Sequence, residues 1–208
     1  MEKKKTKPIF TAKELAIIAI FAAITAVLAQ IAIPIPLITP MPISFGLVAV
    51  YMTGILLKPK HAVLAQICYL ALGAVGIPVF GNFRGGIGAL FGPTGGYLLV
   101  YPIMAWIVAK ALNGSQKRDK QSTHSKWILF LKAGVSMCIA HTILYSGGTA
   151  WLSITSGNSF LASLSLAVVP FIPLDIVKIL FCIFAIVPFR ARLLSMKLLM
   201  LDDTGTHS

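Results

Sequence analysis

The chain has 208 residues, of which 57% are hydrophobic and only 12% charged, and its net charge at pH 7 is +12. Soluble domains carry about 25% charged residues, so this composition excludes an ordinary soluble domain, and its long apolar runs favour a helical integral membrane protein. Because the lysines and arginines gather in short clusters between those runs, they are interpreted as topology signals, and no nucleic-acid partner is expected.

Six runs are apolar enough to be membrane-spanning helices, for which about 20 residues are needed. They cover roughly residues 12–33, 43–57, 62–77, 97–112, 127–147 and 169–189. The Gly-rich stretch PVFGNFRGGIGALFGPTGG separates the third run from the fourth. Residues 148–168 are harder to place, because they are apolar but rich in Ser and Thr. They could extend the fifth helix and then re-enter as a short helix near the outer surface. Because irregular chain exposed to lipid is forbidden, they either pack on protein or lie at the membrane interface.

The distribution of basic residues predicts the orientation of these spans. If the N-terminus is cytoplasmic, the outer segments contain one basic residue, Arg84. The inner segments then contain Lys58, Lys60, Lys117, Arg118, Lys120, Lys126, Arg190, Arg192 and Lys197. The positive-inside rule therefore predicts both termini inside. The expected architecture is a single six-helix membrane domain over residues 1–208, with short basic cytoplasmic tails at 1–11 and 190–208.

The first run carries alanines at positions 12, 16, 19, 23 and 26. This spacing of four and three places them on one stripe of a helix, and small residues let another helix approach closely within a membrane. The stripe either packs against the chain's own helices or forms a docking face for a partner, and the spacing alone does not separate these two readings.

Seven glycines fall within the sixteen residues from Gly81 to Gly96. Glycine permits backbone conformations with positive φ, so this stretch can fold back into the mouth of the bundle. Several large apolar side chains among the glycines argue against a flexible connector. The P-loop pattern G-x-x-x-x-G-K-[ST] does not occur in the sequence, so any ATP that drives transport is expected to be hydrolysed by another subunit.

Asp175 and Lys178 stand out in the sixth run, since a charge at the bilayer centre costs about 2.5–3.5 kcal/mol on insertion scales. Their i, i+3 spacing places them on one helix face, where they can pair. Pro170 and Pro173 precede or begin this helix, so Asp175 is expected in its first turn, where a carboxylate suits the helix dipole. Either the pair is structural or it belongs to a ligand site. An apolar pair would be at least as stable, and ionisable residues within a membrane are functional by default, so the ligand site is favoured.

The chemistry of such a site follows from its donors and acceptors. A carboxylate accepts hydrogen bonds, an ammonium donates them, and Asn82 in the Gly-rich stretch can do both. Together these groups suit a small polar ring with two N–H donors and a carbonyl, such as a cyclic urea. Arg84 either holds a ligand carboxylate or is a solvated charge at the rim.

Other polar residues within the runs are expected to form interhelical hydrogen bonds, namely His141, Tyr145, Gln30 and Gln66. A proton relay through His141 is the alternative, although no second carboxylate accompanies it in the sequence. Asp175 is the one acid within a span interior, and the motifs GxSxG and HExxH do not occur. The chain is therefore not expected to be an enzyme.

The stretch GNFRGGIGALFGPTGGYLL, followed later by PFIPLDIVKI, resembles the biotin-specific substrate-binding (S) components of energy-coupling-factor (ECF) transporters. The resemblance covers nearly the whole chain. It implies a multi-pass protein of the bacterial plasma membrane that captures biotin from outside. It also implies three partner subunits: a transmembrane coupling protein and two cytoplasmic ATPases, which carry the ATP and Mg, so that this chain itself needs no cofactor.

The resemblance also assigns roles to residues. Asp175 and Lys178 match the Pro-x-Asp-x-x-Lys element that contacts the bicyclic head of biotin, and Asn82 and Tyr97 match the loop region near the ligand. Phe80, Phe83 and Trp151 are expected to form apolar walls, and the stripe through Ala19 and Ala23 is expected to dock on the coupling protein. The alternatives are an S component for another vitamin, or a self-sufficient ion-coupled secondary transporter.

Overall fold

The computed structural model describes residues 10–33, 43–113 and 124–195. The Pro-rich segment after the first helix, the basic loop at 114–123 and most of both predicted tails lie outside the described residues. The described part is almost entirely helical, as predicted, with one short antiparallel ribbon of two strands.

The first helix, α1, spans Ala12–Gln30 and begins with a capping box. The Thr11 hydroxyl accepts a hydrogen bond from the Glu14 N–H, and the Glu14 carboxylate accepts one from the Thr11 N–H at 2.8 Å. This reciprocal pairing satisfies backbone donors that a helix start otherwise leaves free. Beyond α1, strand β1 (Ala32–Ile33) pairs with β2 (Ile43–Ser44), which leads into the next helix.

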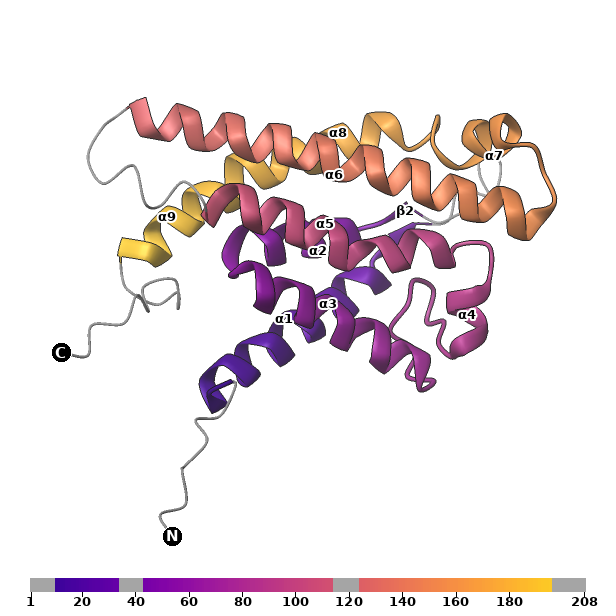
Figure 1. Cartoon of the computed structure of the whole chain (residues 1–208), viewed down its shortest axis with the longest axis horizontal. Helices are drawn as coiled ribbons and strands as arrows, with labels where there is room; N and C mark the ends of the chain where they lie inside the picture. The colour runs from indigo at the N-terminus through magenta and orange to yellow at the C-terminus, as the bar shows by residue number, and fades with distance from the viewer. Residues whose placement is uncertain (1–9, 34–42, 114–123, 196–208) are drawn as a thin grey trace, which may run out of the picture.

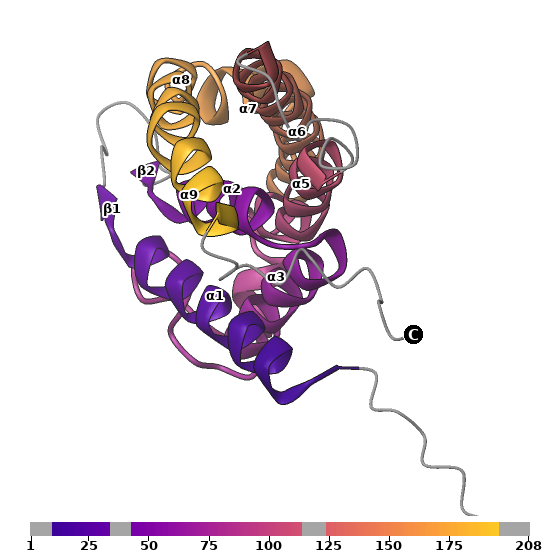
Figure 2. The same ribbon diagram turned by 90° about the vertical axis from the view of Figure 1, so that its left-hand side faces the viewer.

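The remaining elements follow in chain order. They are α2 (Gly46–Leu56), α3 (Pro59–Ala74), α4 (Ile87–Phe91), α5 (Gly95–Asn113), α6 (His124–Ser156), α7 (Phe160–Ala167), α8 (Ile172–Phe181), a π-helical turn η1 (Cys182–Ile186) and α9 (Val187–Ser195). Helix α5 packs against α6, α3 and α2, and α1 packs against α3 and α2. Figures 1 and 2 show α1 and α3 on one side of the bundle, α6 and α8 on the opposite side, and α2 and α5 between them.

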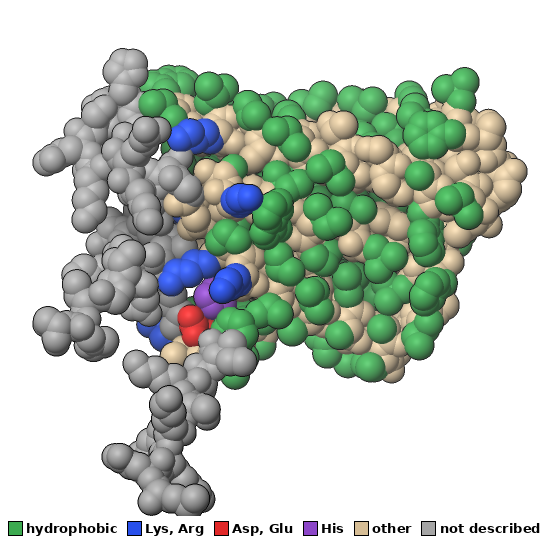
Figure 3. All heavy atoms as spheres, viewed as in Figure 1, with side chains coloured by type: hydrophobic (Ala, Val, Ile, Leu, Met, Phe, Trp, Pro, Cys, Tyr) green, Lys and Arg blue, Asp and Glu red, His purple; other side chains and the backbone are tan. Residues whose placement is uncertain are grey.

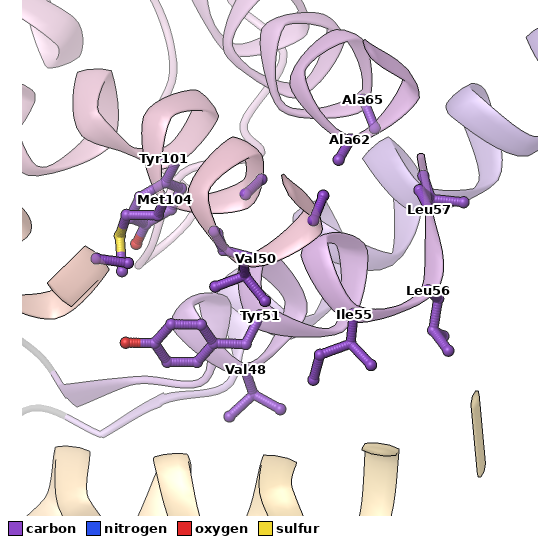
Figure 4. Packing of buried hydrophobic residues seen from close by; sticks show 14 of the residues in the cluster. Val48, Val50, Tyr51, Ile55, Leu56, Leu57, Ala62, Ala65, Tyr101 and Met104 are labelled. Atoms are coloured by element: carbon purple, nitrogen blue, oxygen red, sulfur yellow. The ribbon is translucent and has the colours of Figure 1, made fainter. Parts of the chain in front are cut away.

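Helix α2 lies at the centre of the core, and nine of its eleven residues are buried. A helix that is apolar on every face belongs in the core of a protein or in a membrane span. Figure 4 shows its side chains, among them Tyr51 and Ile55, pointing in several directions towards neighbouring helices. Gly54 allows the closest approach, because a Cβ there would lie 2.9 Å from the carbonyl oxygen of Ala105 in α5.

Within the part of the chain that the structure describes, four helical stretches are long and apolar enough to cross a membrane: residues 12–30, 95–113, 127–156 and 172–190. Helices α2 and α3 lie where the second and third spans are predicted, but they have only 11 and 16 residues. The six-span count therefore stays a prediction.

Helical structure continues beyond two of the predicted spans, 127–147 and 169–189. As expected for residues 148–168, α6 continues to Ser156 and the short helix α7 follows. The first part of the predicted C-terminal tail, residues 190–195, is helical, because α9 extends to Ser195. Arg190 is only 1% exposed. Its guanidinium donates to the Ile55 carbonyl oxygen and, at 3.0 Å, to Asn113 Oδ1, and these bonds tie α9 to α2 and α5.

Candidate functional site

A cavity of about 140 Å³ lies between the Gly-rich segment and the helices α3, α5, α6 and α8. Aromatic side chains make up much of its wall: Tyr69, Phe80, Tyr97, Tyr101 and Phe171. Asp175 and Lys178 also line it, which places two charged groups in a mostly apolar pocket. Pockets of this composition, with a few convergent polar groups, are typical of small-molecule sites.

The first turns of α8 place the charge pair, as predicted. Pro173 lies in the first turn of the helix, where its missing N–H has no intrahelical partner to lose. Asp175 follows and is 3% exposed, and Lys178 one turn later is 6% exposed. The Lys178 ammonium donates to Asp175 Oδ1 at 2.9 Å. The pair is therefore formed, buried and open to the cavity.

The other oxygen of Asp175 is held by α6. His141 Nε2 lies 3.0 Å from Asp175 Oδ2, and the Tyr145 hydroxyl donates to the same oxygen at 2.7 Å. His141 and Tyr145 are thus interhelical hydrogen-bonding residues, as expected. In the sequence no carboxylate lies near His141. In the structure Asp175 lies beside it, because α8 packs against α6.

Gln30, the last residue of α1, holds the segment that closes one side of the cavity. Its Nε2 donates to the carbonyl oxygens of Pro78 and Phe80, both at 3.1 Å, and its Oε1 accepts from the Phe83 N–H at 2.9 Å. Phe80 is buried against Tyr69, with the ring centroids 5.5 Å apart. The amide of Gln30 therefore satisfies three backbone groups of a loop that has little regular structure of its own.

The predicted site residues divide into two groups. Arg84 and Tyr97 line the same cavity as Asp175 and Lys178. Asn82 and Phe83 are exposed and lie outside the cavity wall. Both adopt the left-handed backbone, with φ of 61° and 55°, which belongs to a tight turn at the tip of the loop, and Phe83 is 72% exposed.

The expected apolar walls divide in the same way. Phe80 lines the cavity, whereas Trp151 lies outside its wall and donates from Nε1 to the Gly92 carbonyl oxygen at 2.9 Å. Tyr69, Tyr101 and Phe171 also line the cavity, although no pattern in the sequence predicts it. Tyr145, which is expected to form an interhelical hydrogen bond, lines the cavity as well, and its i+4 spacing places it on the same face of α6 as His141.

Most of the alanine stripe of α1 faces away from the chain's own helices, although Ala26 at its end packs partly against the core. Ala19 and Ala23 are exposed, whereas the buried residues of α1 lie on another face and include Ala22 and Thr25. This excludes internal packing as the role of Ala19 and Ala23, and leaves that face to lipid or to a partner.

Three comparisons with known proteins bear on these features. A model of the BioY family matches residues 1–195. A probable biotin transporter BioY from Pyrococcus horikoshii is 36% identical over 167 residues, which are 80% of this chain and 90% of that protein. The biotin transporter BioY2 of Lactococcus lactis subsp. cremoris is 34% identical over 178 residues, 85% of this chain and 90% of that protein. A crystal structure of the S component for biotin from an ECF-type ABC transporter superposes with a TM-score of 0.70 at 25% identity, and the match covers 88% of this chain and 95% of that one.

Proposed function

Because the chain belongs to the BioY family, whose members are transporter S components of the plasma membrane rather than enzymes, we propose that it binds biotin from outside and delivers it across the membrane together with an ATP-driven ECF module. The observation that carries this proposal is the Asp175–Lys178 pair, buried at the wall of a cavity that aromatic side chains otherwise line.

The pair matches one edge of the ureido ring of biotin. An N–H of the ring donates to Asp175, and the neighbouring carbonyl accepts from Lys178, whose ammonium has three donors and uses one on Asp175. The sulfur-containing ring and the aliphatic chain then lie against the aromatic walls, where their apolar surface leaves water. Arg84, which lines the cavity from the loop side, is the cation for the biotin carboxylate.

The proposed topology has six spans with both termini in the cytoplasm. Figure 3 supports it, since the lysine and arginine side chains visible on this face gather at one end, where Figure 1 places the start of α1 and the end of α9. Cytoplasmic ends of membrane proteins carry an excess of such residues. In this orientation the loop with Arg84 lies at the outer surface, so the cavity takes its ligand from outside.

The partner module of this proposal comprises a transmembrane coupling protein and two cytoplasmic ATPases, on which ATP and Mg are bound. The outward alanines at positions 19 and 23 form the proposed docking face on the coupling protein, because small side chains let two transmembrane helices approach closely.

Calorimetry of the purified protein in detergent tests the ligand. Titration with biotin is expected to show saturable binding, whereas thiamine and riboflavin are expected to show none and to leave biotin binding unchanged. Binding of another vitamin in place of biotin would make the chain an S component for that vitamin. Uptake by this chain alone in liposomes, driven by an ion gradient, would replace the ATP-driven module with secondary transport.

A further inference from the structure

We propose that His141 is a positioning residue for the ligand site: together with Tyr51 behind it, it holds Asp175 Oδ2 so that Oδ1, beside Lys178, is the oxygen offered to the ligand. The inference rests on the proposed biotin-binding function and adds how the carboxylate is oriented for it. His141 and Tyr51 are both buried, and neither belongs to the cavity wall. Their effect on a ligand therefore passes through Asp175.

The hydrogen bonds run through three helices. Tyr51 in α2 places its hydroxyl 2.7 Å from His141 Nδ1, and His141 in α6 places Nε2 3.0 Å from Asp175 Oδ2 in α8. Tyr51 is 1% exposed and lies in the most buried helix of the bundle. The orientation of the carboxylate is thus tied to the core and not only to its own helix.

Counting lone pairs shows which atom remains for a ligand. A carboxylate offers about four acceptor positions, two on each oxygen. Oδ2 already accepts from His141 and from Tyr145, so both of its positions are used. Oδ1 accepts from Lys178 alone among the described contacts, so one position remains there. A ligand N–H is therefore directed to Oδ1, next to the ammonium that binds the ligand carbonyl.

The same contacts assign the proton on the imidazole. Nε2 faces a carboxylate, which only accepts, so Nε2 carries a hydrogen. Nδ1 then accepts from the Tyr51 hydroxyl, and the donations run in one direction from Tyr51 through His141 to Asp175. A neutral imidazole in this position leaves Asp175 and Lys178 as a pair of zero net charge, which suits an uncharged ring such as a cyclic urea.

Substitutions at His141 test this role through rescue by a conservative variant. His141→Leu removes the donor to Oδ2 and is expected to weaken biotin binding about tenfold or more, the usual effect of losing a hydrogen bond to a charged group. His141→Gln carries an amide N–H that reaches about the place of Nε2, and it is expected to restore affinity to within about threefold of wild type. Tyr51→Phe removes one oxygen atom and is expected to weaken binding by about threefold, since it frees the imidazole to turn.

A matched control separates positioning from general support of the bundle. Gln66 is also a buried polar residue between helices, and its Nε2 donates to Thr25 and Thr53 at 3.1 Å, away from the cavity. Gln66→Met is expected to lower the melting temperature in detergent and to leave biotin affinity unchanged. If His141 were only structural, its variants would behave like this control, with lower melting temperatures and unchanged affinity, and the inference would be overturned.

Calorimetry with biotin is carried out on the wild-type protein, on the four variants His141→Leu, His141→Gln, Tyr51→Phe and Gln66→Met, and on Asp175→Asn. It distinguishes the positioning role of His141 from the proposed ligand site itself. Loss of affinity in Asp175→Asn and His141→Leu, with recovery in His141→Gln, supports both. Loss in Asp175→Asn with wild-type affinity in His141→Leu overturns the positioning role and leaves the proposed site intact. Wild-type affinity in Asp175→Asn overturns the site itself. Should His141→Leu fail to fold, Tyr51→Phe decides, since unchanged affinity in that variant contradicts the inference.

Discussion

The side-chain amide of Gln30 donates to the carbonyl oxygen of Phe80 at 3.1 Å and so fastens the end of α1 to the segment that covers the cavity. The same amide binds Pro78 and Phe83, so one side chain holds three points of that segment. The outward alanines lie on this same helix. The side chain of Gln30 therefore links the segment that covers the proposed ligand site to the helix that carries the proposed docking face.

Replacing Gln30 is expected to speed the escape of biotin more than it lowers stability. Gln30→Leu removes all three bonds, and the dissociation rate constant is expected to rise about tenfold, as for the loss of one or two net hydrogen bonds. Gln30→Glu keeps the acceptor for the Phe83 N–H but places a carboxylate beside two carbonyl oxygens, so it is expected to be at least as fast as Gln30→Leu. Stopped-flow chase of labelled biotin gives these rates, and a wild-type rate in Gln30→Leu would show that the cover does not depend on this side chain.

Removing either charge of the buried pair is expected to weaken binding strongly. Asp175→Asn leaves Lys178 without its anionic partner and is expected to cost about 100-fold in biotin affinity, with Lys178→Met of similar size. Both variants are expected to remain folded, since the remaining helix contacts are unchanged. Lys110→Met is the matched control, because Lys110 lies over the Trp106 ring at the other end of α5 and does not line the cavity. Calorimetry with wild-type-like affinity in Asp175→Asn would refute the assignment of the site.

Two glycines near the cover offer a paired test of packing around Phe80. A Cβ at Gly73 would lie 2.0 Å from Phe80 Cζ, so Gly73→Ala must displace a ring that is buried against Tyr69. We expect a loss of about 1–3 kcal/mol in the free energy of unfolding, as for other overpacked cores, together with weaker biotin binding. Gly88→Ala is the control, since nothing lies within 4 Å of its added Cβ. Thermal unfolding and calorimetry measure both effects, and equal behaviour of the two variants would contradict this account.

The sequence predicts the parts of the site that membrane energetics make conspicuous. Asp175 and Lys178 are recognisable because charges are costly in an apolar run, and Pro173 indicates where their helix begins. The partnership of Tyr51 with His141, 90 positions apart, depends on the rotation of two helices about their axes, which composition and spacing do not determine.

The conformation of the Gly-rich segment, too, is only partly predictable from composition and spacing. Its glycines correctly indicate a folded-back chain that borders the cavity, and Gly86 does adopt positive φ. The residues at the turn that also take the left-handed conformation are Asn82 and Phe83, although a large aromatic residue rarely does so. The bonds of the loop to Gln30 help to hold this conformation, and they come from a helix about fifty residues earlier in the chain. For this reason the sequence could not predict which side chains of the loop face the cavity.

The outward alanines of α1 provide a test that separates binding from transport. Ala19→Trp and Ala23→Trp place a large ring on the exposed face, away from the cavity wall, so biotin affinity in detergent is expected to remain at the wild-type value. Uptake of labelled biotin by cells that also produce the coupling protein and both ATPases is expected to fall by about tenfold or more, because a bulky side chain prevents close helix approach. Ile20→Trp is the control, since Ile20 is exposed, already large and lies off the alanine stripe. Unimpaired uptake in both alanine variants, or an equal loss in Ile20→Trp, would show that this stripe is not the docking face.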